Sequence, residues 1–444
     1  MTAHRFLLIA AAFALAAGTP ANAQRPPGAG DRAPSIKPAP AEARSLPPIV
    51  FFVASGEPNA CGVGCREWIV AEGTIDKGAD ERLRALLQRL GKRKLPIFFH
   101  SPGGSVAAGL AIGRLIRQRG LMAGLGWTVP AGCDPKQRRE PACDKLKRSG
   151  RDLVAVLDTR YTMCNSACVY AFVGGAVREV EAQAVFGVHS ISFALRHVDA
   201  DGRVTRAPSP LTPAAERKAF ELWYGRIGAY LREMGISQDL LAAARAVENE
   251  RLQYLTREQI AAFGIDRRQA IESLWWFVDQ SSGPSAVKVI EENRAGAFRR
   301  DILRLTCRGA TNLRLQYTRE IGEGPDRPPK RLRVNASVGS VLFGPVESYR
   351  GSGGPTEIRS ADVPLSLLGE TVFTIEAAEP AGDLGGSAPG AAASFSPVTV
   401  RSAGPGLGGL SRRCRPTDVG PGVPSEPSDH FGGRAFVAPM EPKA

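Results

Sequence analysis

Beyond its first residues, this chain of 444 residues contains no apolar run long enough to cross a bilayer, which excludes further membrane-spanning helices. Residues 1–23 combine Arg5, a short apolar stretch and an Ala-Asn-Ala site, the pattern of a signal peptide cleaved after Ala23. The alternative is an uncleaved anchor, for which this apolar stretch is short. We therefore expect a soluble, exported protein that is periplasmic or secreted.

The sequence also lacks a basic cluster interleaved with aromatic residues. Its formal net charge is +13, yet Lys and Arg are spread along the chain, and the densest cluster, 136–151, also holds acidic residues. A nucleic-acid-binding surface concentrates basic residues on one face or element. We therefore expect no nucleic-acid partner, and interpret the positive charge as a solvated surface facing an anionic cell envelope.

The eight cysteines form an even number, and all of them lie beyond the signal segment. An oxidising compartment favours disulfides, and sequential pairing is the simplest of many possible pairings. A zinc site built from two C-x3-C segments is the alternative, but this spacing is unusual for zinc, so we expect no metal. The candidate disulfide cysteines are Cys61, Cys65, Cys133, Cys143, Cys164, Cys168, Cys307 and Cys414.

No internal repeat divides the chain, but its composition changes along it. Residues 24–47 are rich in Pro, Ala and Gly and are expected to be flexible. Residues 48–283 alternate strand-like and helix-like runs, which predicts an α/β domain with parallel strands. Residues 284–416 contain short alternating runs separated by Gly and Pro, typical of a small all-β domain, and 417–444 form a loose tail.

The individual runs give the expected elements. In the α/β domain we expect strands over 48–55, 95–99, 121–129 and 182–191, and helices over 80–92, 105–120, 166–177, 212–235 and 256–264. In the β domain, strand-like runs cover 301–307, 313–320, 331–343, 370–377 and 395–401.

The stretch HSPGGSV (100–106) lies between a buried strand and a helix. Its two glycines permit backbone conformations and close approaches that other residues forbid. Free N–H groups at such a helix start attract negative charge and can stabilise the oxyanion of a reacting carbonyl. A tight structural turn also favours Pro-Gly-Gly, so the motif alone is not decisive.

Two further segments offer a nucleophile and a base. Ser166, in CNSACVYAFVGG (164–175), is expected at the first turn of a buried helix, where a serine often serves only as a cap. His189, in FGVHSIS (186–192), is one of only five histidines, although a lone strand histidine is often a core residue. Because a hydroxyl nucleophile needs an adjacent base, we predict that Ser166 and His189 act as a pair.

These segments, in this order, resemble the ClpP/crotonase superfamily, and most closely an exported branch similar to the proteolytic subunit of the Clp protease. The resemblance covers about residues 48–270 and is carried by FFHSPGGSVAAGLAIGRLI, NSACVYAFVGG, GVHSI and LTREQIAAFGID. It implies stacked ββα units and a serine peptidase that needs no cofactor. It also implies that Ser166 is the nucleophile, that His189 is the general base, and that the N–H groups of Gly104 and Ala167 form the oxyanion hole.

The sequence departs from the family where the third catalytic residue is expected. The family has an acid just before the Leu-Thr of the short late helix, but here the stretch RAVENERLQYLT (245–256) contains no Asp. Glu250 is the nearest candidate and Glu248 the next; without either of them the triad is a dyad. The Ser–Lys pair of other relatives is disfavoured, because no well-placed Lys is found near Ser166 or after the histidine segment.

We therefore expect a periplasmic serine hydrolase, in particular a peptidase, that acts on a polypeptide. The alternative is a catalytically silent scaffold that binds an envelope protein through the β domain. A crotonase-like enzyme acting on an acyl thioester is disfavoured, because coenzyme A is not expected outside the cytoplasm. The resemblance also implies a possible homo-oligomer. An ATPase partner is not expected, because an exported protein has no ATP supply.

Overall fold

A computed structural model describes residues 47–134, 140–193, 195–198, 204–280, 283–294, 296–309, 311–321, 331–351, 354–369, 372–378, 397–401, 407, 410 and 413–414. The expected signal peptide, almost all of segment 24–47, and the tail 417–444 lie outside these residues. Within the described part of the chain, no helix has the length and apolar character needed to cross a membrane.

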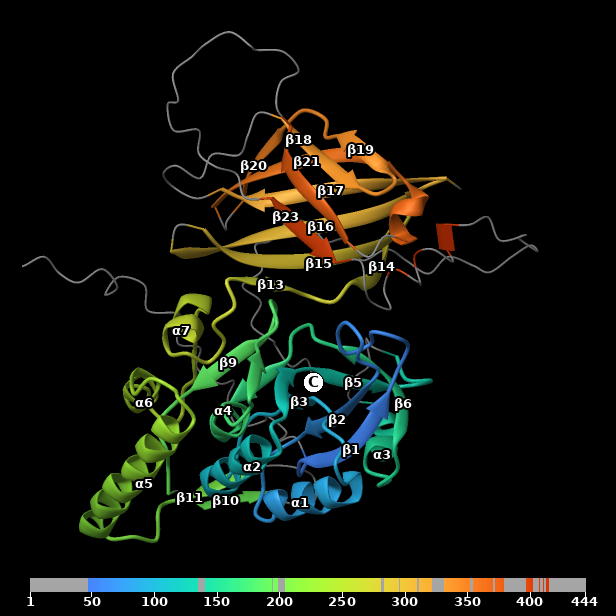
Figure 1. Ribbon diagram of the computed structural model, residues 1–444. Coiled ribbons are helices and arrows are strands. Elements are labelled where there is room, and N and C mark those ends of the chain that lie inside the picture. Colours follow the sequence, from blue (N-terminus) through green and yellow to red (C-terminus); the bar gives the residue numbers. More distant parts are fainter. Residues whose placement is uncertain are drawn as a thin grey trace, which may run out of the picture. The chain divides into compact units, whose positions relative to one another are not determined.

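The first part of the chain has mixed α/β structure (Figure 1). Its strands are β1 (Val50–Ser55), β2 (Glu67–Glu72), β3 (Ile97–His100), β4 (Met122–Leu125), β5 (Trp127–Pro130), β6 (Leu153–Asp158), β7 (Met163–Asn165), β8 (Val177–Glu179), β9 (Val185–Val188), β10 (Leu195–Val198), β11 (Val204–Ala207) and β12 (Gln253–Tyr254). Its helices are α1 (Ala79–Leu90), α2 (Val106–Arg119), α3 (Pro141–Lys147), α4 (Ala167–Phe172), α5 (Pro213–Glu233), α6 (Asp239–Arg245) and α7 (Arg257–Ala262).

Three sheets organise these strands. The largest has the order β5-β6-β1-β2-β3-β4-β8, and its β2-β3-β4-β8 part is parallel. A three-stranded sheet, β12-β9-β7, pairs β7 with β9 in parallel and β12 with β9 antiparallel. Strands β10 and β11 form a separate hairpin. The parallel strands follow the expected strand–helix alternation, because parallel neighbours need a crossover connection.

Local signals in the sequence explain where the main helices begin. The Ser105 side chain accepts a hydrogen bond from the Ala108 N–H at the start of α2, and Thr212 caps α5 in the same way. Helix α7 opens with a capping box, in which Thr256 and Gln259 satisfy each other's backbone N–H groups. Each cap stands where the sequence predicts a helix start.

One apolar cluster joins the layers of this first part. It takes Leu83 from α1, Ile112 from α2, Phe172 from α4 and Tyr230 from α5, each fully or almost fully buried. The Tyr230 hydroxyl donates to the carbonyl of Tyr170 at 2.6 Å, which ties α5 to α4. Helix α4 is therefore held inside the core, and the residue that precedes it, Ser166, is held with it.

From β13 onward the described elements are strands, apart from the short 3-10 helix η2 (Leu365–Gly369) and isolated residues after 401. The strands are β13 (Ala270–Glu272), β14 (Trp276–Gln280), β15 (Gly283–Arg294), β16 (Ala297–Arg308), β17 (Asn312–Glu320), β18 (Leu332–Ala336), β19 (Gly339–Leu342), β20 (Glu347–Gly351), β21 (Gly354–Pro364), β22 (Val372–Ala377) and β23 (Val398–Arg401). They form the sheet β13-β15-β16-β17-β21-β20, with β14 also on β15, and the sheet β19-β18-β22-β23.

A second apolar cluster belongs to these strands. Leu303 and Leu305 of β16 alternate with more exposed residues, and so do Leu313 and Leu315 of β17. This alternation is the pattern expected for strands with one face on a core. The expected boundary at 283/284 remains a prediction, but β13 and β14, which lie before it, pair with β15 rather than with the first part of the chain.

Several expected elements have different bounds in the structure. The helix expected over 166–177 ends at Phe172, because the chain turns at Gly174 and Gly175 and continues as β8. The strand expected over 121–129 is two strands, β4 and β5, separated by Gly126. A Cβ at Gly126 would lie 2.4 Å from the Leu157 side chain, so the break brings two segments close together. The sequence patterns did not reveal the strands β2, β6, β7 and β12, the β10–β11 hairpin, or the short helices α3 and α6.

All eight cysteines are disulfide-bonded, in the sequential pairing that was the simplest of the possible pairings. The bonds are Cys61–Cys65, Cys133–Cys143, Cys164–Cys168 and Cys307–Cys414. The four cysteines of the zinc alternative are therefore engaged in two disulfides.

Candidate active site

The glycine loop after β3 runs between two other backbone segments. On one side, the Ile75 N–H donates to the Gly103 carbonyl at 2.8 Å, and the Ser105 N–H donates to the Ile75 carbonyl at 2.7 Å. Gly104 is the bridge partner of Ile75 in this parallel pairing, so its own N–H points to the opposite side. No described acceptor takes this N–H.

That opposite side is where the Ser166 turn lies. An added Cβ at Gly103 would lie 2.4 Å from the Asn165 carbonyl oxygen, 2.7 Å from the Ser166 Cβ and 3.0 Å from the Ala167 N. Gly103 also has a φ of +96°. Only glycine fits this approach, because both the space and the backbone conformation exclude a side chain. The loop and the turn are thus packed backbone to backbone.

Ser166 has an unusual backbone conformation, with φ 55° and ψ −121°. Among the described non-glycine residues, only Asn59, Tyr161 and Ser166 have positive φ. Such a conformation costs about 1–3 kcal/mol, persists only where the surroundings impose it, and is concentrated at functional sites. Ser166 is also half-buried, unlike its fully buried neighbours Ala167 and Cys168.

The Ser166 hydroxyl is not used as a helix cap, although Ser166 occupies the N-cap position of α4. Ala167 is the first residue of the helix, where the N–H groups have no acceptor within the helix. The N–H groups of Gly104 and Ala167, both expected to form the oxyanion hole, therefore lie on the two segments that pack against each other at Gly103.

His189 follows β9, the parallel neighbour of β7. Asn165 is paired with Gly187, and the Ser166 N–H donates to the Gly187 carbonyl at 2.8 Å. The end of β7 at Ser166 therefore lies next to the end of β9, which His189 follows. Segments distant in sequence, ending in Gly104, Ser166 and His189, thus meet at one end of β7 and β9.

The His189 ring contacts the side chain of Asn249. The Nδ2 atom of Asn249 lies 2.9 Å from Nδ1 of His189 and donates to the Ser190 carbonyl at 2.6 Å. The Ser190 N–H donates in turn to the Val247 carbonyl at 2.9 Å, which keeps the two segments together. Asn249 thus occupies the place beside the imidazole where a serine peptidase carries its acid.

Neither expected acid is the residue at this contact. Glu250, the first candidate, is exposed, and Glu248, the second, is exposed and paired with Arg251 at 3.6 Å. Their assignment as a catalytic acid remains an untested prediction. A search of this stretch for a carboxylate misses Asn249, although asparagine has the same shape as aspartate and stands between the two glutamates.

The Cys164–Cys168 disulfide encloses the Ser166 turn. Cys164 lies in β7 and Cys168 in α4, and both residues are fully buried. The bond therefore joins the strand and the helix on either side of the strained residue. A covalent link at this place restricts the relaxation of the turn toward ordinary backbone angles.

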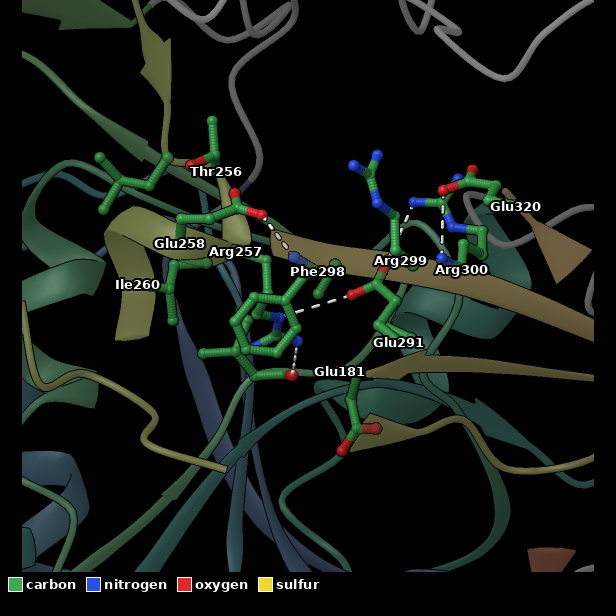
Figure 2. Close-up of a pocket in the computed structure, with 14 residues that line it drawn as sticks. Glu181, Thr256, Arg257, Glu258, Ile260, Glu291, Phe298, Arg299, Arg300 and Glu320 are labelled. Carbon is green, nitrogen blue, oxygen red and sulfur yellow. Dashed lines mark hydrogen bonds and ion pairs between the residues drawn. The ribbon is translucent and has the colours of Figure 1, made fainter. Parts of the chain in front are cut away.

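A polar cavity of about 280 Å³ lies near the start of β9 and does not include Ser166 or His189 among its lining residues (Figure 2). The Arg257 guanidinium contacts Glu291 at 3.4 Å, and Glu258 accepts the Phe298 N–H at 2.8 Å. In Figure 2, Glu181 lies below Glu291, and Arg299 and Arg300 lie above it. Burial raises the pKa of the Glu181 carboxyl to about 7, against the opposing effect of Arg268.

We expect Glu181→Gln to change how stability depends on pH. The pKa of Glu181 is higher in the native state, at about 7, than in the unfolded chain. Ionisation of this carboxyl therefore destabilises the native state increasingly as the pH rises from the unfolded-state pKa to about 7. Glutamine removes this penalty, so the variant should gain up to about 3 kcal/mol relative to wild type between pH 5 and pH 8. Urea unfolding of both proteins at the two pH values measures the gain, and an equal pH dependence would contradict this assignment.

Comparison with known proteins identifies no family for this chain. No family model and no curated protein matches it. Among solved structures, ClpP1 from Listeria monocytogenes shares 15% identity, with 45% of this chain and 87% of that chain covered, at a TM-score of 0.27. A variant of the 1510-N membrane-bound stomatin-specific protease, in complex with a substrate peptide, shares 15% identity, with 44% and 71% covered, at a TM-score of 0.27. At this TM-score and identity, neither structure establishes a function for this chain.

Proposed function

We propose that this chain is an exported serine hydrolase, in particular a peptidase, built on ClpP-like stacked ββα units. The observation that carries the proposal is the conformation of Ser166. A half-buried serine held at φ 55° before a buried helix, with its hydroxyl not used as a cap, is unfavourable for a purely structural residue. The same features suit a nucleophile that must project from a sharp strand-to-helix turn.

The surrounding groups define a chemical role for each residue. The Ser166 oxygen attacks the carbonyl carbon of a peptide bond while His189 accepts the hydroxyl proton. The developing oxyanion is directed to the N–H groups of Gly104 and Ala167. His189 then returns the proton to the leaving amine as the C–N bond breaks, and water releases the acyl group in a second, equivalent step. These reaction steps need no cofactor.

The disulfides support a location in an oxidising compartment. Four bonds use every cysteine, whereas cytosolic proteins usually keep their thiols reduced. Together with the expected signal peptide, this supports the periplasm or the exterior as the site of action. A polypeptide substrate from this compartment is then the partner that the proposed chemistry requires.

A fluorophosphonate probe, which reacts with activated serines, tests the proposal. We expect the wild-type protein to be labelled, slowly but measurably, and Ser166→Ala to lose all labelling, because the nucleophile is absent. Circular dichroism of both proteins shows whether they are folded under the same conditions. Equal labelling of folded wild type and folded Ser166→Ala would refute the proposal.

A second candidate function is a catalytically silent binding protein of the cell envelope. The observation in its favour is the Asn249 side chain on His189, where an acid would support catalysis. This candidate predicts no labelling of either the wild type or a variant with an aspartate at position 249. The two functions therefore differ in the outcome of a single experiment.

A further inference from the structure

The hydrogen bonds of Asn249 determine the orientation of its side-chain amide. The Ser190 carbonyl can only accept a hydrogen bond, so the amide end 2.6 Å from it is the NH2 group and not the oxygen. Reversing the amide would place two acceptor oxygens in contact. The hydrogen-bond network therefore assigns Nδ2, not Oδ1, to the position 2.9 Å from Nδ1 of His189.

This orientation determines the tautomer of the imidazole. An NH2 group only donates, so Nδ1 of His189 is the acceptor, and the proton of the neutral ring resides on Nε2. A general base for a serine needs the opposite arrangement, with a proton on Nδ1 and a lone pair on Nε2. With Nδ1 accepting from Asn249, the proton is on Nε2, the nitrogen that a base for Ser166 would use.

The same contact disfavours the imidazolium. A doubly protonated ring would direct its Nδ1–H at the Asn249 NH2 group, so protonation of His189 requires Asn249 to turn and give up its bond to Ser190. An aspartate at this place accepts from Nδ1–H and stabilises the imidazolium that forms during catalysis. Asparagine thus opposes both states of the ring that the reaction needs.

We propose that Asn249 is a positioning residue that holds His189 in the Nε2–H tautomer and keeps the site in a slow resting state. The inference rests on the proposed function of Ser166 and His189, and adds a regulatory group to that site. Full activity then requires either a turn of the Asn249 amide or a carboxylate in its place. In a serine peptidase triad, an asparagine in the place of the acid lowers kcat by about 10⁴.

The test is the rate of fluorophosphonate labelling of the full chain. We expect Asn249→Asp to be labelled about 10²-fold or more faster than the wild type, because the carboxylate restores the Nδ1–H tautomer. Asn335→Asp is the matched control: it adds the same charge at an exposed position of β18 and should be labelled at the wild-type rate. If Asn249→Asp is folded and labelled no faster than the wild type, the inference is overturned.

Nitrogen NMR gives a second readout that does not depend on catalysis or on the aspartate variant. In the wild type, the His189 signals, assigned by comparison with His189→Gln, should show a protonated Nε2 and an unprotonated Nδ1 at neutral pH. In Asn249→Ala, which removes the donor, the Nε2–H population should fall. A wild-type proton on Nδ1 overturns the inference even if Ser166 is labelled, whereas equal labelling of Ser166→Ala overturns the proposed function even if the tautomer is as expected.

Discussion

Replacing Gly103 with alanine should lower the rate of fluorophosphonate labelling by about 10²–10³-fold, because it displaces both the nucleophile and the oxyanion donors. The new Cβ would lie 2.4 Å from the Asn165 carbonyl oxygen and 2.7 Å from the Ser166 Cβ. Real Cβ atoms do not approach backbone so closely, so the loop and the Ser166 turn must separate. The labelling rate of Gly103→Ala is compared with that of the wild type. The same comparison can be made in the Asn249→Asp background, where labelling is expected to be faster.

The matched control is Gly132→Ala. Gly132 also has a positive φ, +85°, but an added Cβ there meets no atom within 4 Å. This variant carries the cost of an unfavourable backbone conformation without the collision, so it should be labelled at the wild-type rate. Equal rates for folded Gly103→Ala and Gly132→Ala would mean that the glycine loop does not position Ser166, which would contradict the account of the site.

Removing the Cys307–Cys414 disulfide should cause the largest loss of stability among the disulfides. It closes a loop with a sequence separation of 107, for which the loss of unfolded-state entropy predicts about 4–5 kcal/mol. The Cys61–Cys65 disulfide has a separation of 4, for which the same relation predicts about 2 kcal/mol. Urea unfolding of the two double alanine variants measures the difference.

The physical reason is that a long closed loop restricts the unfolded chain more than a short one. Cys307 lies in β16 and Cys414 is buried in the same apolar cluster, so this disulfide also joins two ends of one core. The prediction is contradicted if Cys307→Ala/Cys414→Ala loses no more free energy of unfolding than Cys61→Ala/Cys65→Ala. Loop length would then not determine how much each disulfide stabilises the protein. Both variants are compared under non-reducing conditions, in which the remaining disulfides stay formed.

Local signals allowed much of the first part of the chain to be predicted. Helices α2, α5 and α7 begin within one residue of the predicted starts at 105, 212 and 256, where Ser105, Thr212 and Thr256 cap them in the structure. The disulfides have the sequential pairing, the simplest of the many pairings that the sequence left open. The end of α4 was mispredicted, since apolar residues continue past Phe172 and only the glycine pair at 174–175 marks the turn into β8.

The contact between Asn249 and His189 was beyond the reach of sequence reasoning. It depends on how the segment after α6 lies against the end of β9, which is a tertiary arrangement and not a local pattern. The pairing of β13 and β14 with β15 was missed for a related reason: short apolar runs do not reveal their partner strands. Residue types predicted the candidate site, but only the fold identifies the side chain beside the imidazole.

The central claim is that Ser166, His189 and the N–H groups of Gly104 and Ala167 act on one reacting group. A crystal structure of the Asn249→Asp variant after reaction with a fluorophosphonate tests this claim most directly. The account predicts that phosphorus is bonded to Ser166 Oγ. The phosphoryl oxygen should lie about 2.7–3.1 Å from the backbone nitrogens of Gly104 and Ala167, and the His189 ring should lie within hydrogen-bond distance of Oγ. An adduct on another residue, or a phosphoryl oxygen directed away from Gly104 and Ala167, would contradict it.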